Sequence, residues 1–354
     1  MKFKQRITRL FVFASVLMLF VSCSPSGSDS IVVYSGRSRA LVDDLVKKFE
    51  AKTGYTVDVR YGNDAELLAV MKEEGDQSPA DLFWANTTGA LANANKSEML
   101  KTLPDTLLQV PDSYRSSSGV WLPVTVRFRV LAYNPDRVDP DELPRSVLDL
   151  PGATRFEGRV GWTPTYSSFY DFITTMRDLE GEETTRAWLD GMQQLNPSSY
   201  SSNPPMLQAL IAGEIDIALT NHYYILQYKY GGAEGEYEEE VYFDEPVVDE
   251  NAPVETYHFA TGDIGNLALV TGASLLQTSD QDQVALEFLR FLVSEEAQRY
   301  AADVVHEYPV INTVTLPEYM LESEKAINIS PEYDYENLQN LGGTLNLLRE
   351  AGLI

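Results

Sequence analysis

The chain has 354 residues, of which 44% are hydrophobic, and it carries a formal net charge of −26. This acidic balance argues against nucleic-acid binding, because the phosphate backbone attracts basic surfaces. A single cysteine excludes internal disulfides. Stability must therefore come from hydrophobic packing, and the chain is long enough to form two lobes.

The first 22 residues have the pattern of a bacterial export signal. Four basic residues lie within the first nine positions, and an apolar run extends from Leu10 to Val21. This run is too short for a membrane-spanning helix, which needs about 20 apolar residues. The only cysteine, Cys23, follows at the position where the signal of a bacterial lipoprotein has its lipidated cysteine. We expect cleavage after residue 22, a lipid anchor on Cys23, a linker over 23–30 and an extracytoplasmic location. An ordinary signal peptide is the alternative.

From residue 31 onward, the hydrophobic pattern predicts alternating strands and helices. The predicted strands lie at 31–35, 55–61 and 80–85, and the predicted helices at 40–54, 64–74 and 89–100. A repeated strand–helix–strand order is typical of an α/β lobe with a mostly parallel sheet.

A long strand-like stretch over 120–135 carries the chain into a second set of elements. This set comprises strands at 159–164 and 214–220 and helices at 167–179, 182–195 and 204–213. A strand-like stretch at 261–279 follows, then one long helix over 280–303 or two helices broken near Ser294, and an amphipathic end at 335–354.

Two adjacent tyrosines, Tyr223 and Tyr224, stand just after the strand predicted at 214–220. With 20 tyrosines in the chain, one adjacent pair is expected by chance. Their position is more informative, because ligands of open α/β sheets bind at the carboxyl ends of strands. A strand end need not keep strict alternation, so both phenols can face a ligand there.

Eight short stretches complete the pattern: "VYSGRS", "EEGDQSPADLFWANTTGAL", "VRFRVLAYNP", "GWTPTYSSF", "AGEIDIALTNHYY", "GDIGNLALVTGASLL", "FLRFLVSEEAQRYAAD" and "EYPV". Their order and spacing resemble those of the ferric-iron-binding proteins of bacterial ABC importers. The resemblance covers nearly the whole chain after the signal.

The resemblance implies a two-lobed clamp with the type II periplasmic-binding-protein fold, in which each lobe is a mixed, mostly parallel sheet flanked by helices. We expect strands to form the hinge, with crossings near Arg127 and Tyr257. The expected boundaries are 31–127 and 257–305 for lobe 1 and 128–256 and 306–354 for lobe 2. A monomer of this kind would deliver its cargo to an ABC permease and the associated ATPase.

The resemblance also implies that Tyr223 and Tyr224 bind Fe(III). The chemistry agrees, because a small and highly charged cation prefers anionic oxygen ligands. A free phenol has a pKa near 10, and a bound cation lowers the pKa of its ligand. Both phenols can therefore bind as phenolates at neutral pH and release their protons.

The chain departs from the family in the first lobe. Ser38 and Arg39 stand where many members have a histidine or tyrosine ligand, and Asn86 stands where a carboxylate is frequent. Asn86 either supplies a neutral carbonyl oxygen or caps a strand end. A third tyrosine from the second lobe would supply the missing charge. Tyr166, in the loop before a predicted helix, is the first candidate, and Tyr170, in the first turn of that helix, is the second.

Members of this family hold an anion beside the metal, so we expect carbonate or another small anion here. Helix starts bind anions through free amide hydrogens, and arginines form charge-assisted hydrogen bonds. The candidate residues are Arg127, Arg37, Ser167, Ser168, Asn203 and Asn221.

Two other functions are alternatives to an iron carrier. An enzyme would need a nucleophile with its base, paired carboxylates or a catalytic metal, and the three histidines show no metal-ligand spacing; we expect no enzymatic activity. The same clamp with another cargo, such as thiamine, a polyamine, a phosphonate or another anion, is the closer alternative.

Overall fold

The computed structural model describes residues 30–111, 114–232 and 248–354. Cys23 and the predicted signal lie outside the described residues, so cleavage and lipid attachment stay predictions. Within the described ranges, no helix is long and apolar enough to cross a membrane.

The first elements of the chain are strand–helix units, as the hydrophobic pattern predicted. They are β1 (Ser30–Ser35), α1 (Arg39–Thr53), β2 (Thr56–Tyr61), α2 (Asp64–Glu74), β3 (Leu82–Ala85) and α3 (Thr88–Lys96). Helix α1 ends at Gly54, whose φ of 79° is a left-handed conformation that glycine adopts without strain. Strand β1 pairs in parallel with both β2 and β3. We call the lobe built around these strands the first lobe.

The second set of elements begins with the long strand β4 (Leu122–Tyr133). It continues with β5 (Val160–Trp162), α4 (Ser167–Leu179), α5 (Glu182–Gln194), β6 (Ser198–Ser199), α6 (Asn203–Ile211), β7 (Ile217–Asn221) and α7 (His222–Tyr230). Strand β5 pairs in parallel with β6 and β7. The lobe around these three strands is the second lobe.

The last part of the chain adds elements to both lobes. They are β8 (Glu255–Tyr257), β9 (Ala268–Leu275), α8 (Asp282–Leu292), α9 (Glu295–Tyr300), β10 (Tyr308–Pro309), α10 (Ser323–Ile329) and α11 (Leu341–Glu350). The region 280–303 contains two helices rather than one, because the Ser294 side chain accepts a hydrogen bond from the Ala297 amide and starts α9.

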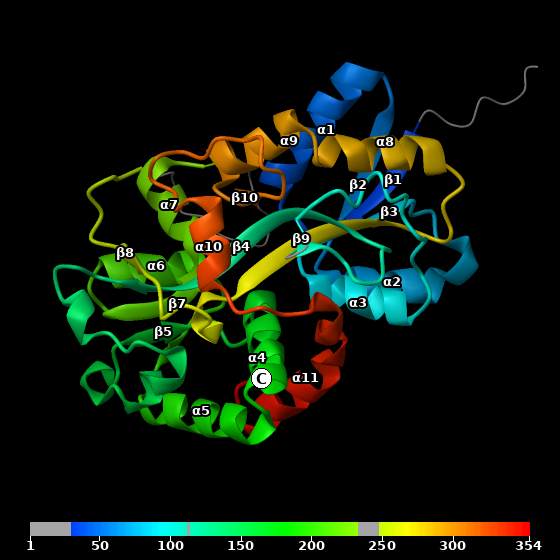
Figure 1. Cartoon of the computed structure of the whole chain (residues 1–354). Helices are drawn as coiled ribbons and strands as arrows, with labels where there is room; N and C mark the ends of the chain where they lie inside the picture. Colours follow the sequence, from blue (N-terminus) through cyan, green and yellow to red (C-terminus); the bar gives the residue numbers. More distant parts are fainter. Residues whose placement is uncertain (1–29, 112–113, 233–247) are drawn as a thin grey trace, which may run out of the picture.

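Strand β4 joins the two lobes. Its first half, up to Phe128, pairs antiparallel with β9 and β10, and its second half, from Arg129, pairs antiparallel with β7 and β8. The strand order is β2-β1-β3-β9-β4-β7-β5-β6. Figure 1 shows β4 and β9 running between the two groups of helices. The predicted fold class, a mixed α/β clamp, is confirmed.

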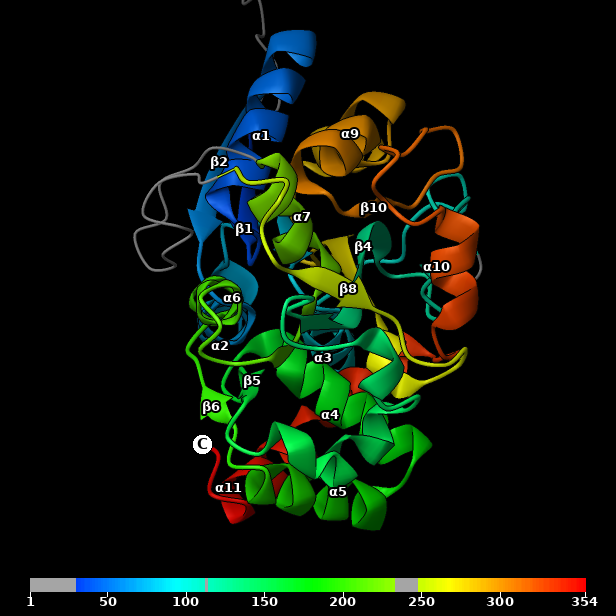
Figure 2. The same cartoon turned by 90° about the vertical axis from the view of Figure 1, so that its left-hand side faces the viewer.

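Separate hydrophobic cores support the lobes, and the end of the chain enters both of the larger ones. Tyr335 and Leu338 belong to the core around β1 and β3, whereas Leu347 and Leu348 belong to the core around β5 and α4. Figure 2 shows α11 beside α5, at the end of the molecule opposite α1. The segment expected to return to the second lobe thus packs against both lobes.

Candidate metal centre

A cleft of about 1070 Å³ lies between the lobes. Side chains from both lobes line it: Arg37, Ser38, Arg39 and Asn86 from the first, Tyr166, Ser167, Tyr170 and Tyr223 from the second, and Glu307 beside them. The cleft therefore brings six of the predicted site residues to one place, whereas Tyr224, Arg127, Ser168, Asn203 and Asn221 are not among its lining residues.

The tyrosine pair stands in a helix and not at a strand end, which corrects the local structure expected from the sequence. Helix α7 starts directly after β7, and Tyr223 and Tyr224 are its second and third residues. Successive helical residues point about 100° apart around the axis. The two ring centroids are nevertheless only 4.1 Å apart, with the planes at 32°. The first turn of α7 thus presents both phenols together.

Tyr166 meets this pair from another element. It occupies the residue before α4, and its hydroxyl oxygen is 2.9 Å from that of Tyr224. Tyr170, in the first turn of α4, is half-buried and packs against the core of the second lobe. Of the two candidates, Tyr166 is the one whose phenol contacts the doublet.

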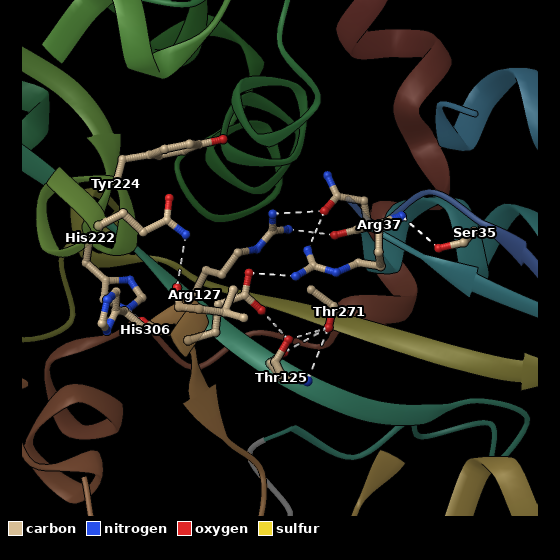
Figure 3. Close-up of polar contacts among 12 residues, drawn as sticks. Ser35, Arg37, Thr125, Arg127, His222, Tyr224, Thr271 and His306 are labelled. Atoms are coloured by element: carbon tan, nitrogen blue, oxygen red, sulfur yellow. Dashed lines mark hydrogen bonds and ion pairs between the residues drawn. The ribbon is translucent and has the colours of Figure 1, made fainter. Parts of the chain in front are cut away.

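Asn86 joins the two predicted arginines. Arg37 and Arg127 each donate an Nη1 hydrogen bond to its Oδ1, at 2.6 and 3.0 Å. Its Nδ2 donates to Ser167 Oγ in the second lobe at 3.4 Å. Arg37 also forms an ion pair with Glu307 at 2.7 Å. Figure 3 shows the two guanidinium groups facing each other.

Burial and charge set the protonation of this region. Burial alone would lower the pKa of the Arg127 guanidinium, but Glu307 and the three neighbouring phenols raise it. Burial raises the pKa of Tyr223, and the nearby Arg127 acts in the opposite direction. Without a cation, the Tyr223 phenol is therefore protonated at neutral pH, while Arg127 is charged.

A second polar cluster lies deeper in the second lobe, near the carboxyl ends of β5 and β7. Each member is buried and has one polar side-chain atom with no hydrogen-bond partner among the described residues: Ser168 Oγ, Asn203 Nδ2, Asn221 Nδ2, Arg129 Nη2 and Thr163 Oγ1. Buried polar groups are nearly always satisfied, so these atoms are expected to bind ordered water or a ligand.

His222 is not available to a metal. Its Nδ1 accepts a hydrogen bond from the Phe128 amide at 3.1 Å, and its Nε2 lies 2.8 Å from the His306 carbonyl oxygen. The described residues include no group of three histidine, cysteine, aspartate or glutamate side chains that could hold a metal. The cleft is also lined by the carboxyl groups of Asp64, Asp171 and Glu307, of which Asp64 accepts hydrogen bonds from the Asn86 and Thr87 amides and Glu307 pairs with Arg37.

The sequence pattern of the bacterial extracellular solute-binding proteins matches residues 35–299. The chain belongs to this family. It is 28% identical to the Fe(3+)-binding periplasmic protein of Serratia marcescens over 345 residues, which are 96% of each chain. It is also 28% identical to iron uptake protein A1 of Synechocystis, covering 94% of this chain and 89% of the relative.

A solved structure of an iron-bound protein is similar to this chain as well. The crystal structure of iron-bound HitA from Pseudomonas aeruginosa has a TM-score of 0.80 and 29% identity, covering 92% of this solute-binding protein and 99% of HitA. The expected resemblance to ferric-iron-binding proteins is confirmed. The relatives are solute-binding proteins, which fits the expectation of a non-enzyme.

Two site residues of this solute-binding protein were missed from the sequence. Arg129 lies two residues after Arg127 in β4, so strand alternation places both on the same side; it faces Asn221 in the strand register and donates to its Oδ1 at 3.2 Å. Burial lowers the pKa of Arg129 to about 10. Glu307 stands in the "EYPV" stretch, but nothing local indicates that it pairs with Arg37, 270 positions away.

Proposed function

We propose that this solute-binding protein carries ferric iron for a bacterial ABC importer and holds the ion through the phenolates of Tyr166, Tyr223 and Tyr224. The observation that carries the proposal is that three phenols meet, one from the residue before α4 and two from the first turn of α7, with 2.9 Å between the Tyr166 and Tyr224 hydroxyl oxygens and 4.1 Å between the rings of the doublet. The names of the relatives in iron uptake support it.

Three phenolates suit the charge of the cargo. Fe(III) is a hard acid that prefers anionic oxygen, and three phenolates balance its charge. Because burial raises the pKa of Tyr223 in the empty site, binding must displace phenolic protons and release them to solvent. Acid should therefore weaken binding, since protons compete for each ligand.

An anion, carbonate or another small one, completes the site in this proposal. Three arginines, Arg37, Arg127 and Arg129, are buried near the phenols, and one of them pairs with the buried carboxylate of Glu307. Buried charges need partners, and among the described residues Arg127 and Arg129 form no ion pair and donate to Asn86 and Asn221 instead, which favours an anion beside them. The residues that would bind it are Arg127, Arg37, Ser167, Ser168, Asn203 and Asn221, with Arg129 and Thr163 added from the unsatisfied cluster.

The first lobe contributes no charged metal ligand in this proposal. Asn86 Oδ1 already accepts hydrogen bonds from two arginines, and the Arg39 guanidinium lies over the Tyr61 ring, 4.2 Å from its centroid. The anion therefore has to fill the coordination positions that a histidine nitrogen and a carboxylate oxygen fill in other members. We expect ferric binding to depend on the anion.

The family supports delivery to a permease, and the predicted signal supports a lipid anchor. The protein would hand iron to a membrane permease driven by its ATPase, and the lipid on Cys23 would hold it at the outer face of the membrane. A Cys23→Ser variant should be released as unlipidated protein. Retention of this variant on membranes, as in the wild type, would contradict the anchor.

One titration tests the cargo. Purified apo protein is titrated with ferric citrate and followed by visible absorbance, in buffer with and without bicarbonate. We expect a saturable phenolate-to-iron charge-transfer band that is stronger with bicarbonate. Absence of the band, together with binding of thiamine, a polyamine or a phosphonate in calorimetry, would establish the same clamp with an organic cargo.

A further inference from the structure

Helix α7, which carries the tyrosine pair, is held at both ends by one residue, His306. At its start, His222 Nδ1 accepts a hydrogen bond from the Phe128 amide, so Nε2 bears the hydrogen and donates it to the His306 carbonyl at 2.8 Å. At its end, His306 Nε2 lies 2.6 Å from the carbonyl oxygen of Gly231, the residue that caps α7. In the middle of the helix, Gln227 Nε2 donates to the carbonyl of Val305 at 3.2 Å.

The ring of His306 is held in turn by Tyr319. The Tyr319 hydroxyl lies 3.1 Å from His306 Nδ1. If this hydroxyl donates, Nδ1 is the acceptor and Nε2 carries the hydrogen that Gly231 accepts. The Tyr319 ring stacks on Tyr230, the last residue of α7, with centroids 3.9 Å apart and planes at 14°. The His306 imidazole and the Tyr319 phenol thus both contact the carboxyl-terminal end of α7.

The backbone at His306 is unusual. It has a φ of 61° and a ψ of 28°, and it follows a five-residue π-helical turn, Ala301–Val305. Left-handed residues other than glycine are uncommon, and π turns are rare and concentrate at functional sites. Glycine would adopt this conformation without strain. Glycine, however, would lack the imidazole ring that contacts both Gly231 and Tyr319.

The next residue connects the same segment to the cleft. Glu307 forms the ion pair with Arg37 at 2.7 Å and accepts a hydrogen bond from the Thr125 hydroxyl of β4. In Figure 3, His222 and His306 lie on one side of Arg127, and Arg37 lies on its other side. Residues 305–307, which we call the bracket, therefore contact α7 on one side and the arginine site on the other.

We propose that the bracket, with His306 at its centre, positions α7 so that Tyr223 and Tyr224 stay aligned with Arg37 and Arg127. His306 is a positioning residue and not a ligand, because it is 2% exposed and both of its ring nitrogens have partners. The proposal rests on the proposed function in one respect, since the two tyrosines are assigned there as ligands.

Two substitutions at His306 distinguish the effect of losing the imidazole ring from the effect of a changed backbone conformation. His306→Gly keeps the left-handed conformation and removes the ring, and His306→Asn keeps a side chain that tolerates this conformation. Hydrogen exchange is measured by mass spectrometry on the full-length apo proteins. We expect faster exchange of the amides in 222–231 in both variants, while the core strands β1 and β4 keep wild-type protection.

Iron binding is then measured on the same proteins. We expect both variants to weaken ferric affinity by about 10–100-fold, as is typical for residues that orient metal ligands, and to change the wavelength of the visible band. A residue with only a structural role would lower the melting temperature and leave the wavelength of the band unchanged.

A milder pair of variants keeps the test valid if the His306 variants fold poorly. Tyr319→Phe removes the hydroxyl that contacts His306, whereas Tyr333→Phe, the matched control, removes a hydroxyl that donates to Asp178 at 2.9 Å, away from α7. Only Tyr319→Phe should loosen 222–231.

Wild-type exchange over 222–231 in both His306 variants, or in Tyr319→Phe if those do not fold, would overturn the proposal. Faster exchange with unchanged affinity and band would also overturn the positioning role. If the wild-type protein binds no iron, the proposed function fails, and the exchange data alone still decide whether the bracket holds α7.

Discussion

Tyr223 and Tyr224 are neighbours in the sequence but have different surroundings. Tyr223 lines the cleft and lies in the electrostatic field of Arg127 and Glu307. Tyr224 is fully buried, and its hydroxyl meets that of Tyr166. Tyr223 therefore faces the open cleft, whereas Tyr224 meets Tyr166 in the interior.

Phenylalanine at either position removes one phenolate and keeps the ring. We expect Tyr223→Phe and Tyr224→Phe each to weaken ferric binding by orders of magnitude and to remove most of the visible band. Tyr170→Phe is the matched control, because this half-buried residue packs against the second core. Wild-type colour and affinity in both doublet variants would leave the pair with a packing role only.

Glu307 is expected to stabilise the fold in a pH-dependent way. Burial would raise the pKa of its carboxyl, but Arg37 and Arg127 lower it below the ordinary value. Because the folded-state pKa is depressed, the stabilisation is present above the unfolded-state pKa and is lost as the pH falls through the folded-state value.

Glu307→Gln should therefore cost about 3–5 kcal/mol of unfolding free energy at pH 7, the typical effect of breaking a buried ion pair. The difference from wild type should shrink as the pH falls below the unfolded-state pKa and through the depressed folded-state pKa, where the wild-type carboxylate becomes protonated. Urea unfolding of the apo proteins at several pH values measures this. A difference that does not change with pH would rule out a charged Glu307.

At the scale of elements, helices α3 and α4 approach each other closely across the lobes. A Cβ on Gly89 of α3 would lie 3.0 Å from Asp171 Oδ1 of α4 and 3.5 Å from the side chain of Leu338. Asp171 is 6% exposed, and burial raises its pKa to about 7. This contact leaves little space for any side chain at position 89.

Gly89→Ala should destabilise the protein by about 1–2 kcal/mol through overpacking, although alanine is the better helix former. The matched control is Gly342→Ala in α11, where nothing lies within 4 Å of the added Cβ; it should be neutral or slightly stabilising. Thermal unfolding of the apo proteins measures both. Equal melting temperatures of the two variants would show that α4 yields to the extra methyl group.

At the scale of the whole molecule, the lobes are joined by a strand, β4, and face each other across the cleft, an arrangement that allows them to move relative to each other. Strand β4 pairs with the first lobe by one half and with the second by the other. Side chains from both lobes line the cleft. A ligand that contacts both lobes binds the closed form more tightly and so shifts the population toward it.

Saturating ferric citrate should therefore reduce the radius of gyration in small-angle X-ray scattering. The doublet variant with both Tyr223→Phe and Tyr224→Phe is the control and should keep the dimensions of the apo protein. An unchanged radius in the loaded wild-type protein would argue against closure.

The sequence by itself determined the element types, the α/β class and the tyrosine, arginine and asparagine candidates. Helical and strand periodicities are local, and residues such as Gly54 and Ser294 mark helix ends through their own backbone or side chain. The helix that carries the tyrosine pair was not predicted: β7 ends at Asn221, one residue after the predicted strand end, and α7 begins directly after it.

Only the tertiary structure decided how the candidates combine. It brings Tyr166 to Tyr224 and Arg37 to Glu307, which are 58 and 270 positions apart in the chain. It also shows that both arginines bind Asn86 Oδ1 and that His306 reaches across to α7. Contacts between distant residues depend on how the elements pack, and no local pattern in the sequence records that packing.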